Sequence, residues 1–105
     1  MTETDRISAR IAALLAQSTN AGWLRLVAHG CVTHEYGSVR VGRVDASGTG
    51  EVAFALDADR ARELVGAFET LHAAWLRAGH ASWEWAHVWL DRDGSVELEV
   101  ELDDR

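Results

Sequence analysis

The chain has 105 residues, 48% of them hydrophobic, which suits one domain with a buried core. It has no apolar run of the roughly 18 residues that span a membrane, no signal-peptide core, and one cysteine, so we expect a cytoplasmic protein without disulfides. The net charge of −7 lies mostly in residues 61–105, which contain ten acidic residues and only four arginines. This acidic balance disfavours nucleic acid as a partner and favours a basic protein.

The first half of the chain predicts one helix and three strands. Residues 5–17 carry apolar side chains at helical spacing, and a polar segment ending in Gly22 stops the helix. Residues 23–34, 38–44 and 51–56 then alternate apolar and polar positions, as half-buried strands do.

A second, longer helix and a hairpin follow. Either Asp57 or Asp59 can cap the helix, its apolar stripe runs to residue 76, and Gly79 ends it. The gaps between strands are short enough for antiparallel turns. We therefore expect a single two-layer α+β domain over residues 1–105, with an antiparallel sheet of about five strands, two helices on one face, and the order α-β-β-β-α-β-β.

The hairpin of residues 82–90 and 95–103 has two different faces. Asp91 and Gly94 suit a type I turn closed by a left-handed glycine. That turn sets Leu90, Val88 and Ala86 against other apolar residues on one face. On the opposite face it pairs tryptophans and a histidine with acids: Trp89 with Glu97, His87 with Glu99, Trp85 with Glu101, and Trp83 with Asp103.

Other arrangements would hide this stripe of tryptophans. A two-residue turn at Asp93-Gly94 shifts the register by one and sets Trp89 beside Leu98, so that the tryptophans are buried. Alternatively, the first helix could cover the stripe, or a symmetric homodimer could seal it. We favour the bulged turn, because Asp91 and Gly94 both occupy the positions that it needs. Tryptophan often anchors partner binding, so partner recognition, a homodimer included, and simple packing into the core both stay open for this stripe.

Catalytic and metal chemistry find little support. Five histidines are present, yet no pair has the i, i+4 helical spacing of a zinc protease, so we expect no metal site and no cofactor. Cys31 shares a strand face with His29, but a lone cysteine within a strand is usually a small buried side chain. The acids of the last strand are most simply a solvated face, and we expect no enzyme.

Three parts of the chain together resemble a known family. They are GWLRL at residues 22–26, WLRAG at 75–79, and the closing hairpin with DRDG at 91–94 before an acidic strand. This pattern is similar to the YezG-like family of bacterial immunity proteins, the antitoxins of polymorphic secreted toxins. The resemblance implies a small α+β protein that binds and inactivates the C-terminal domain of a toxin, often a nuclease.

The charge and the hairpin favour the same function. An acidic strand beside tryptophans could occlude the basic groove of a nuclease, without turnover and with fast, salt-sensitive association. The expected partner-binding residues are Trp83, Trp85, His87, Trp89, Glu97, Glu99, Glu101 and Asp103. The alternative is a chaperone or adaptor-type module for a secreted effector, which uses the same face on an extended segment, for example by adding a strand at a sheet edge.

Overall fold

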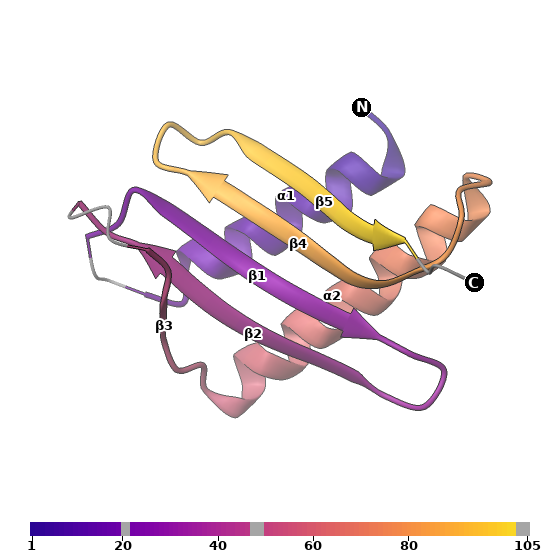
Figure 1. Cartoon of the computed structure of the whole chain (residues 1–105), viewed down its shortest axis with the longest axis horizontal. Helices are drawn as coiled ribbons and strands as arrows, with labels where there is room; N and C mark the ends of the chain where they lie inside the picture. Colours follow the sequence, from indigo (N-terminus) through magenta and orange to yellow (C-terminus); the bar gives the residue numbers. More distant parts are fainter. Residues whose placement is uncertain (20–21, 47–49, 103–105) are drawn as a thin grey trace.

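The computed structural model describes residues 1–19, 22–46 and 50–102, so the predicted site residue Asp103 lies outside the described residues. Two helices and five strands follow the predicted order α-β-β-β-α-β-β (Figure 1). The elements are α1 (Glu3–Ala16), β1 (Arg25–Val32), β2 (Gly37–Val44), β3 (Val52–Ala53), α2 (Ala58–Arg77), β4 (Trp83–Asp91) and β5 (Val96–Leu102).

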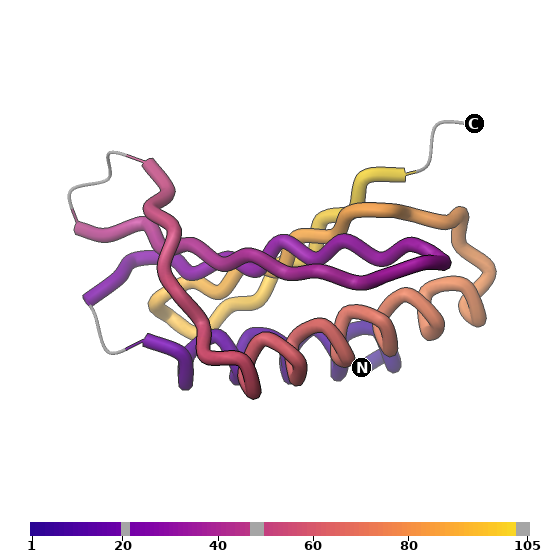
Figure 2. Tube along the Cα trace, turned by 90° about the horizontal axis from the view of Figure 1, so that it is seen from below, coloured from indigo at the N-terminus to yellow at the C-terminus, as the bar shows by residue number. Residues whose placement is uncertain are grey.

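The strands form one antiparallel sheet in the order β3-β2-β1-β4-β5. Both helices lie side by side against the same face, which gives the predicted two-layer α+β architecture (Figure 2). The described residues place no helix over the other face, which is turned toward the viewer in Figure 1. In the described part of the chain no helix is long and apolar enough to cross a membrane.

Local signals set the ends of the helices. Helix α1 begins two residues before the predicted start, because Thr2 caps it and exchanges hydrogen bonds with Asp5 in a capping box. Asp57, one of the two predicted caps, accepts a bond from the backbone N–H of Arg60 at the start of α2. Gly79, at φ 88°, closes α2 with the paired backbone bonds of a Schellman motif.

The core lies between the helices and the inner face of the sheet. Fully buried residues from both layers build it: Ile11 and Leu15 of α1, Leu64, Phe68 and Leu71 of α2, and Leu26, Ala28, Ala86 and Val88 of the central strands. The predicted third strand is shortened to two residues. Phe54 still donates its backbone N–H to the carbonyl of Val41 at 3.3 Å, and the side chains of Phe54 and Leu56 pack on this core before α2 begins.

The β4–β5 turn has the predicted form. Gly94 has φ 93°, and its N–H donates to the carbonyl of Asp91 at 2.9 Å. The cross-strand pairs Trp89–Glu97, His87–Glu99 and Trp85–Glu101 follow, so the register shifted by one residue does not occur. The sequence therefore predicted six consecutive pairs of this hairpin correctly.

The predicted position of Trp83 is wrong. The strand has a β-bulge between Trp83 and Trp85, so the strict alternation breaks there and Trp83 pairs with Leu102. Its side chain turns to the helix side, is only 1% exposed, and packs edge-on against His72 of α2 at 4.8 Å. Burial of this large apolar surface favours the inward position, and it outweighs an indole N–H that has no hydrogen-bond partner among the described residues.

Candidate functional site

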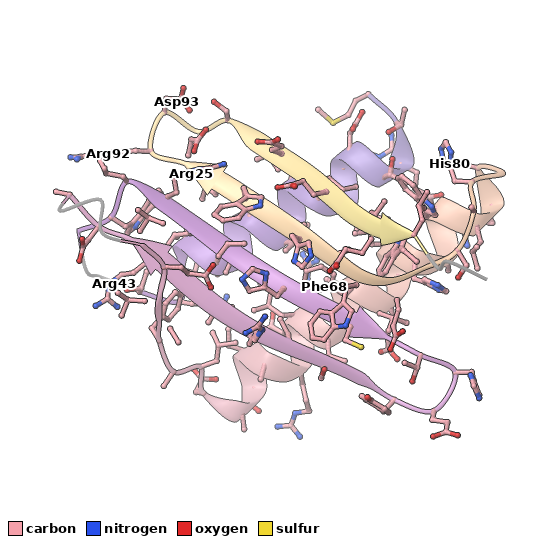
Figure 3. All side chains as sticks on the ribbon, in the orientation of Figure 1. Arg25, Arg43, Phe68, His80, Arg92 and Asp93 are labelled. Atoms are coloured by element: carbon pink, nitrogen blue, oxygen red, sulfur yellow. The ribbon has the colours of Figure 1, made fainter. Side chains whose placement is uncertain are left out.

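The outward face of the sheet combines aromatic, basic and acidic side chains. Figure 3 looks onto this face and shows Arg25 at the end of the sheet near the β4–β5 turn. The outward residues of the paired central strands are half-buried or buried although no helix covers them; for example, Val27 is 0% exposed. The side chains of the face therefore cover one another and form a thin layer of their own.

A row of four polar side chains crosses this face. Nε2 of His29 lies 2.9 Å from Oε2 of Glu51, Nδ1 of His29 lies 2.7 Å from Nδ1 of His87, and Nε2 of His87 lies 2.8 Å from Oε2 of Glu101. We call these four residues the His–carboxylate row. The row links the β3 side of the sheet to the opposite edge strand, β5.

Gly42 makes the first contact of the row possible. Glu51 precedes β3 and must cross β2 to reach His29 in β1. A Cβ atom at Gly42 would lie 2.5 Å from the side chain of Glu51, closer than side chains approach. An isolated glycine inside a strand often marks such a close approach, and here the absence of a side chain at position 42 lets the Glu51 carboxylate cross over β2.

Two arginines hold the tryptophans of the face. The guanidinium carbon of Arg25 lies 4.3 Å from the ring centroid of Trp89, and that of Arg40 lies 5.8 Å from the centroid of Trp85. Arg25 also donates to Asp91 at 2.6 Å. The tryptophans are thus half-buried and fixed in place, and the face presents arginines over their rings as well as the indoles themselves.

The negative charge of the face is gathered on its edge strand. In β5 the side chains of Glu97, Glu99 and Glu101 are exposed, and the strand contains no basic residue. Same-face residues of a strand recur about every 6.6 Å, so these carboxylates form a regular row. Glu97 lies 3.6 Å from Arg25 and Glu101 contacts His87, which leaves Glu99 the least engaged of the three.

The structure thus brings six of the predicted site residues to one face, namely Trp85, His87, Trp89, Glu97, Glu99 and Glu101, and places Trp83 on the other. Sequence reasoning missed the roles of Arg25, His29, Arg40 and Glu51 in organising this face. The glycine inside the second predicted strand was the available signal for Glu51. The pairing of His29 with His87 had no local signal, because it joins strands 58 residues apart.

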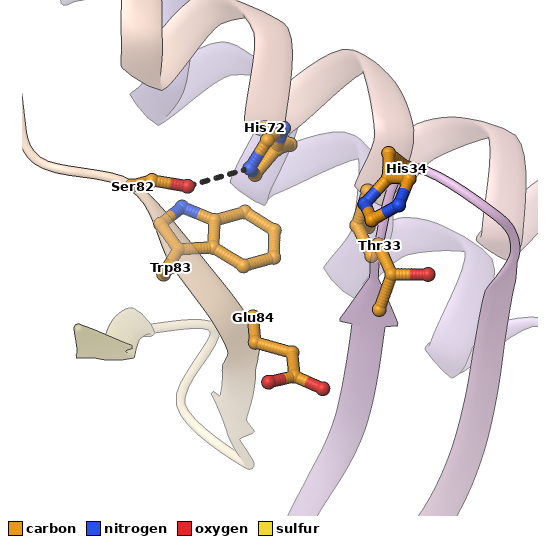
Figure 4. A pocket seen from close by; sticks show the side chains of 7 residues that line it. Thr33, His34, His72, Ser82, Trp83 and Glu84 are labelled. Carbon is orange, nitrogen blue, oxygen red and sulfur yellow. Dashed lines mark hydrogen bonds between the residues drawn. The ribbon is translucent and has the colours of Figure 1, made fainter. Parts of the chain in front are cut away.

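A cavity on the helix side of the sheet is a second candidate site. It has a volume of about 420 Å³, within the range of small-molecule pockets, and lies where β1 ends and β4 begins (Figure 4). Its polar groups are loosely arranged: His72 Nε2 is 3.4 Å from Ser82 Oγ, and the side chain of His34 is 93% exposed. This cavity therefore lacks the close donor and acceptor geometry of the outward face.

Cys31 is chemically quiet. Burial, followed by the negative charge of Glu84, raises the pKa of its thiol above 9.0, although a hydrogen bond with Ser38 opposes the shift. A raised pKa leaves little thiolate near neutral pH, and the thiolate is the nucleophilic form. The cysteine is buried and behaves as a small core residue.

No protein-family model matches this chain, and no curated protein matches it either.

Proposed function

We propose that this protein is an immunity protein, which binds a basic toxin domain with the outward sheet face and blocks the toxin's active groove. The observation that carries the proposal is the exposed acidic strand β5 beside two tryptophans that are already fixed by arginines. The identity of the partner as a toxin, often a nuclease, rests on the resemblance of the sequence to the YezG-like family. The mechanism is occlusion, and it requires neither a cofactor nor turnover.

Charge favours a basic partner. A row of carboxylates on one edge of a face concentrates negative potential there, and it steers a basic protein to that edge before contact. Arg25 and Arg40 lie farther into the face, over the tryptophans. Acidic groups at the rim of the partner's groove would meet these arginines, so the pattern of both signs would fix the orientation of the complex.

Rigid aromatic residues favour tight binding. Trp85 and Trp89 are half-buried, and each has an arginine guanidinium over its ring, so they lose little side-chain freedom when a partner covers them. The indole N–H of Trp89 is buried without a hydrogen-bond partner among the described residues. Tryptophan and arginine are the residues most often found as binding hot spots, and this face has two of each.

The proposal is tested with the neighbour of this gene, which should encode a large protein that ends in a basic domain. That domain should bind the chain and lose its toxic activity. Trp85→Ala should weaken the complex at least tenfold, whereas Tyr36→Ala, an exposed aromatic residue between β1 and β2, should not. Full inhibition by Trp85→Ala at wild-type affinity would contradict the proposed face.

The free edge of β5 favours a second candidate function. This seven-residue strand is the last of the sheet, and Val96 and Leu102 are 39% and 56% exposed. An extended segment of a secreted effector could add to it as a further strand, as in a chaperone or adaptor. Binding of an unfolded peptide, with no affinity for the folded domain, would favour this function.

A homodimer that forms through the outward sheet face would appear as a doubled mass in light scattering.

A further inference from the structure

The His–carboxylate row contains three hydrogen-bonding contacts, but its two neutral imidazole rings carry only two N–H protons between them. A neutral imidazole carries one N–H, and an ionised carboxylate can only accept. Because Nε2 of His29 faces Glu51 at 2.9 Å and Nε2 of His87 faces Glu101 at 2.8 Å, each ring proton is held at Nε2. Both Nδ1 atoms are then left as bare acceptors.

These two bare nitrogens point at each other. They lie 2.7 Å apart while the ring centroids are 4.9 Å apart, so the two nitrogens lie between the rings and face each other. Two acceptors cannot form a hydrogen bond with each other. A positive charge between them, either a metal ion or an additional proton, is needed to make the contact favourable.

The surroundings match those of metal-binding histidines. Such histidines almost always donate their second ring N–H to a carboxylate or carbonyl, which fixes the ring and frees the other nitrogen for the metal. Here both histidines have this arrangement, and their side chains are only 10% and 20% exposed. With metal–nitrogen bonds of about 2.0–2.1 Å and a tetrahedral angle, the nitrogens need a separation of about 3.3 Å, a shift of roughly 0.6 Å.

The charges around the row favour a cation with two positive charges. Glu51 and Glu101 touch the rings, and Glu99 lies opposite His87 on β5. Two arginines lie on the same face, Arg40 as the β2 partner of His29 and Arg25 at the end of β1, and both lie over tryptophans. The two touching carboxylates balance the ion, whereas an extra proton would balance only one of them.

We infer that His29 and His87 together bind one divalent transition-metal ion through their Nδ1 atoms, with Glu51 and Glu101 as positioning residues. Imidazole ligands suit Zn²⁺, Cu²⁺ and Ni²⁺. Among the described residues no group of three or more histidine, cysteine, aspartate and glutamate side chains is arranged to hold a metal, so the chain would supply two ligands and water would occupy the remaining positions of the ion. The inference concerns the isolated chain and does not depend on the proposed toxin partner.

The test is a titration of the chelator-treated full chain with ZnCl₂ and with NiCl₂, followed by calorimetry. We expect one ion per chain, and a loss of affinity of at least tenfold in His29→Ala and in His87→Ala. Glu51→Gln and Glu101→Gln keep both rings and should weaken binding about 10- to 100-fold. The matched controls are His34→Ala and His80→Ala, which change exposed histidines outside the row and should bind as the wild type does.

Two results would overturn the inference. The first is a folded wild-type chain that binds neither ion at millimolar concentration. Equal affinity in the wild type, in Glu51→Gln and in both alanine variants would place any bound ion elsewhere. Circular dichroism of each variant separates these outcomes from a failure to fold.

Discussion

Gly42→Ala tests whether the carboxylate of Glu51 must cross β2 to reach His29. The new methyl group would lie 2.5 Å from the Glu51 side chain, so Glu51 must give up its place. A hydrogen bond to a charged group contributes about 1.5–3 kcal/mol, which we reduce to about 1–2 kcal/mol because the Glu51 side chain is 33% exposed. Replacing glycine inside a strand by alanine returns about 0.5–1 kcal/mol.

The two effects separate in a double-mutant cycle with Glu51→Ala. In the wild-type chain Gly42→Ala should lower the free energy of unfolding by about 0.5–1 kcal/mol. The three atoms nearest to the new methyl group all belong to the Glu51 side chain and are absent from the Glu51→Ala chain, so there the same change should raise the free energy of unfolding by about 0.5–1 kcal/mol. The coupling energy is then about 1–2 kcal/mol, measured by urea unfolding with tryptophan fluorescence.

A matched control is Gly66→Ala in helix α2, where a Cβ atom would have no neighbour within 4 Å. It should stabilise both backgrounds equally, by about 1 kcal/mol. Gly42→Ala effects that are the same with and without Glu51 would refute the crossing of β2 by this carboxylate. The His–carboxylate row would then lose its first member.

Three further changes probe the core, the cap and the thiol. Trp83→Ala should cost about 3–5 kcal/mol in urea unfolding because the indole is fully buried, and Trp85→Ala clearly less; equal costs would contradict the inward position of Trp83. Asp57→Ala removes the cap of α2 and should cost about 0.5–2 kcal/mol, whereas Asp59→Ala should stay within about 0.5 kcal/mol. Since the folded state raises the pKa of Cys31 above 9.0, the folded protein holds that proton more tightly than the unfolded chain. The contribution of Cys31 to stability should therefore be constant below pH 9 and decline above it, and Cys31→Ala should remove this part of the decline; a reactive thiol at neutral pH would contradict the shift.

The hairpin could be predicted because its signals are local. Asp91 and Gly94 determine the turn, the turn determines the register, and the register decides which face each side chain joins. The prediction failed at Trp83 because of the β-bulge between Trp83 and Trp85, since an alternating sequence does not show where a strand carries an extra residue. Only the burial of the indole beside His72 makes the inward position favourable.

The outward face could be predicted only in part, because its centre depends on pairing between distant segments. His29 meets His87 because β4 inserts beside β1, and Glu51 joins them from beyond β2. The sequence of β1 or of β4 alone does not indicate that the two strands pair, and contacts between such distant segments leave no periodic pattern. The arginines over the tryptophans are likewise a consequence of the sheet order. The sequence therefore predicted uncovered tryptophan rings, whereas in the structure a guanidinium lies over each of Trp85 and Trp89.

The most direct test of the account compares two triple variants that change the net charge equally. One carries Glu97→Gln, Glu99→Gln and Glu101→Gln on the outward face, and the other Asp59→Asn, Glu63→Gln and Glu69→Gln on α2. The measurement is the association rate with the basic domain encoded beside this chain, across a range of salt concentrations. The account predicts a roughly tenfold or greater slowing and a weaker salt dependence for the first variant alone. Equal rates for the two variants would contradict it, because net charge and not the acidic strand would then govern binding.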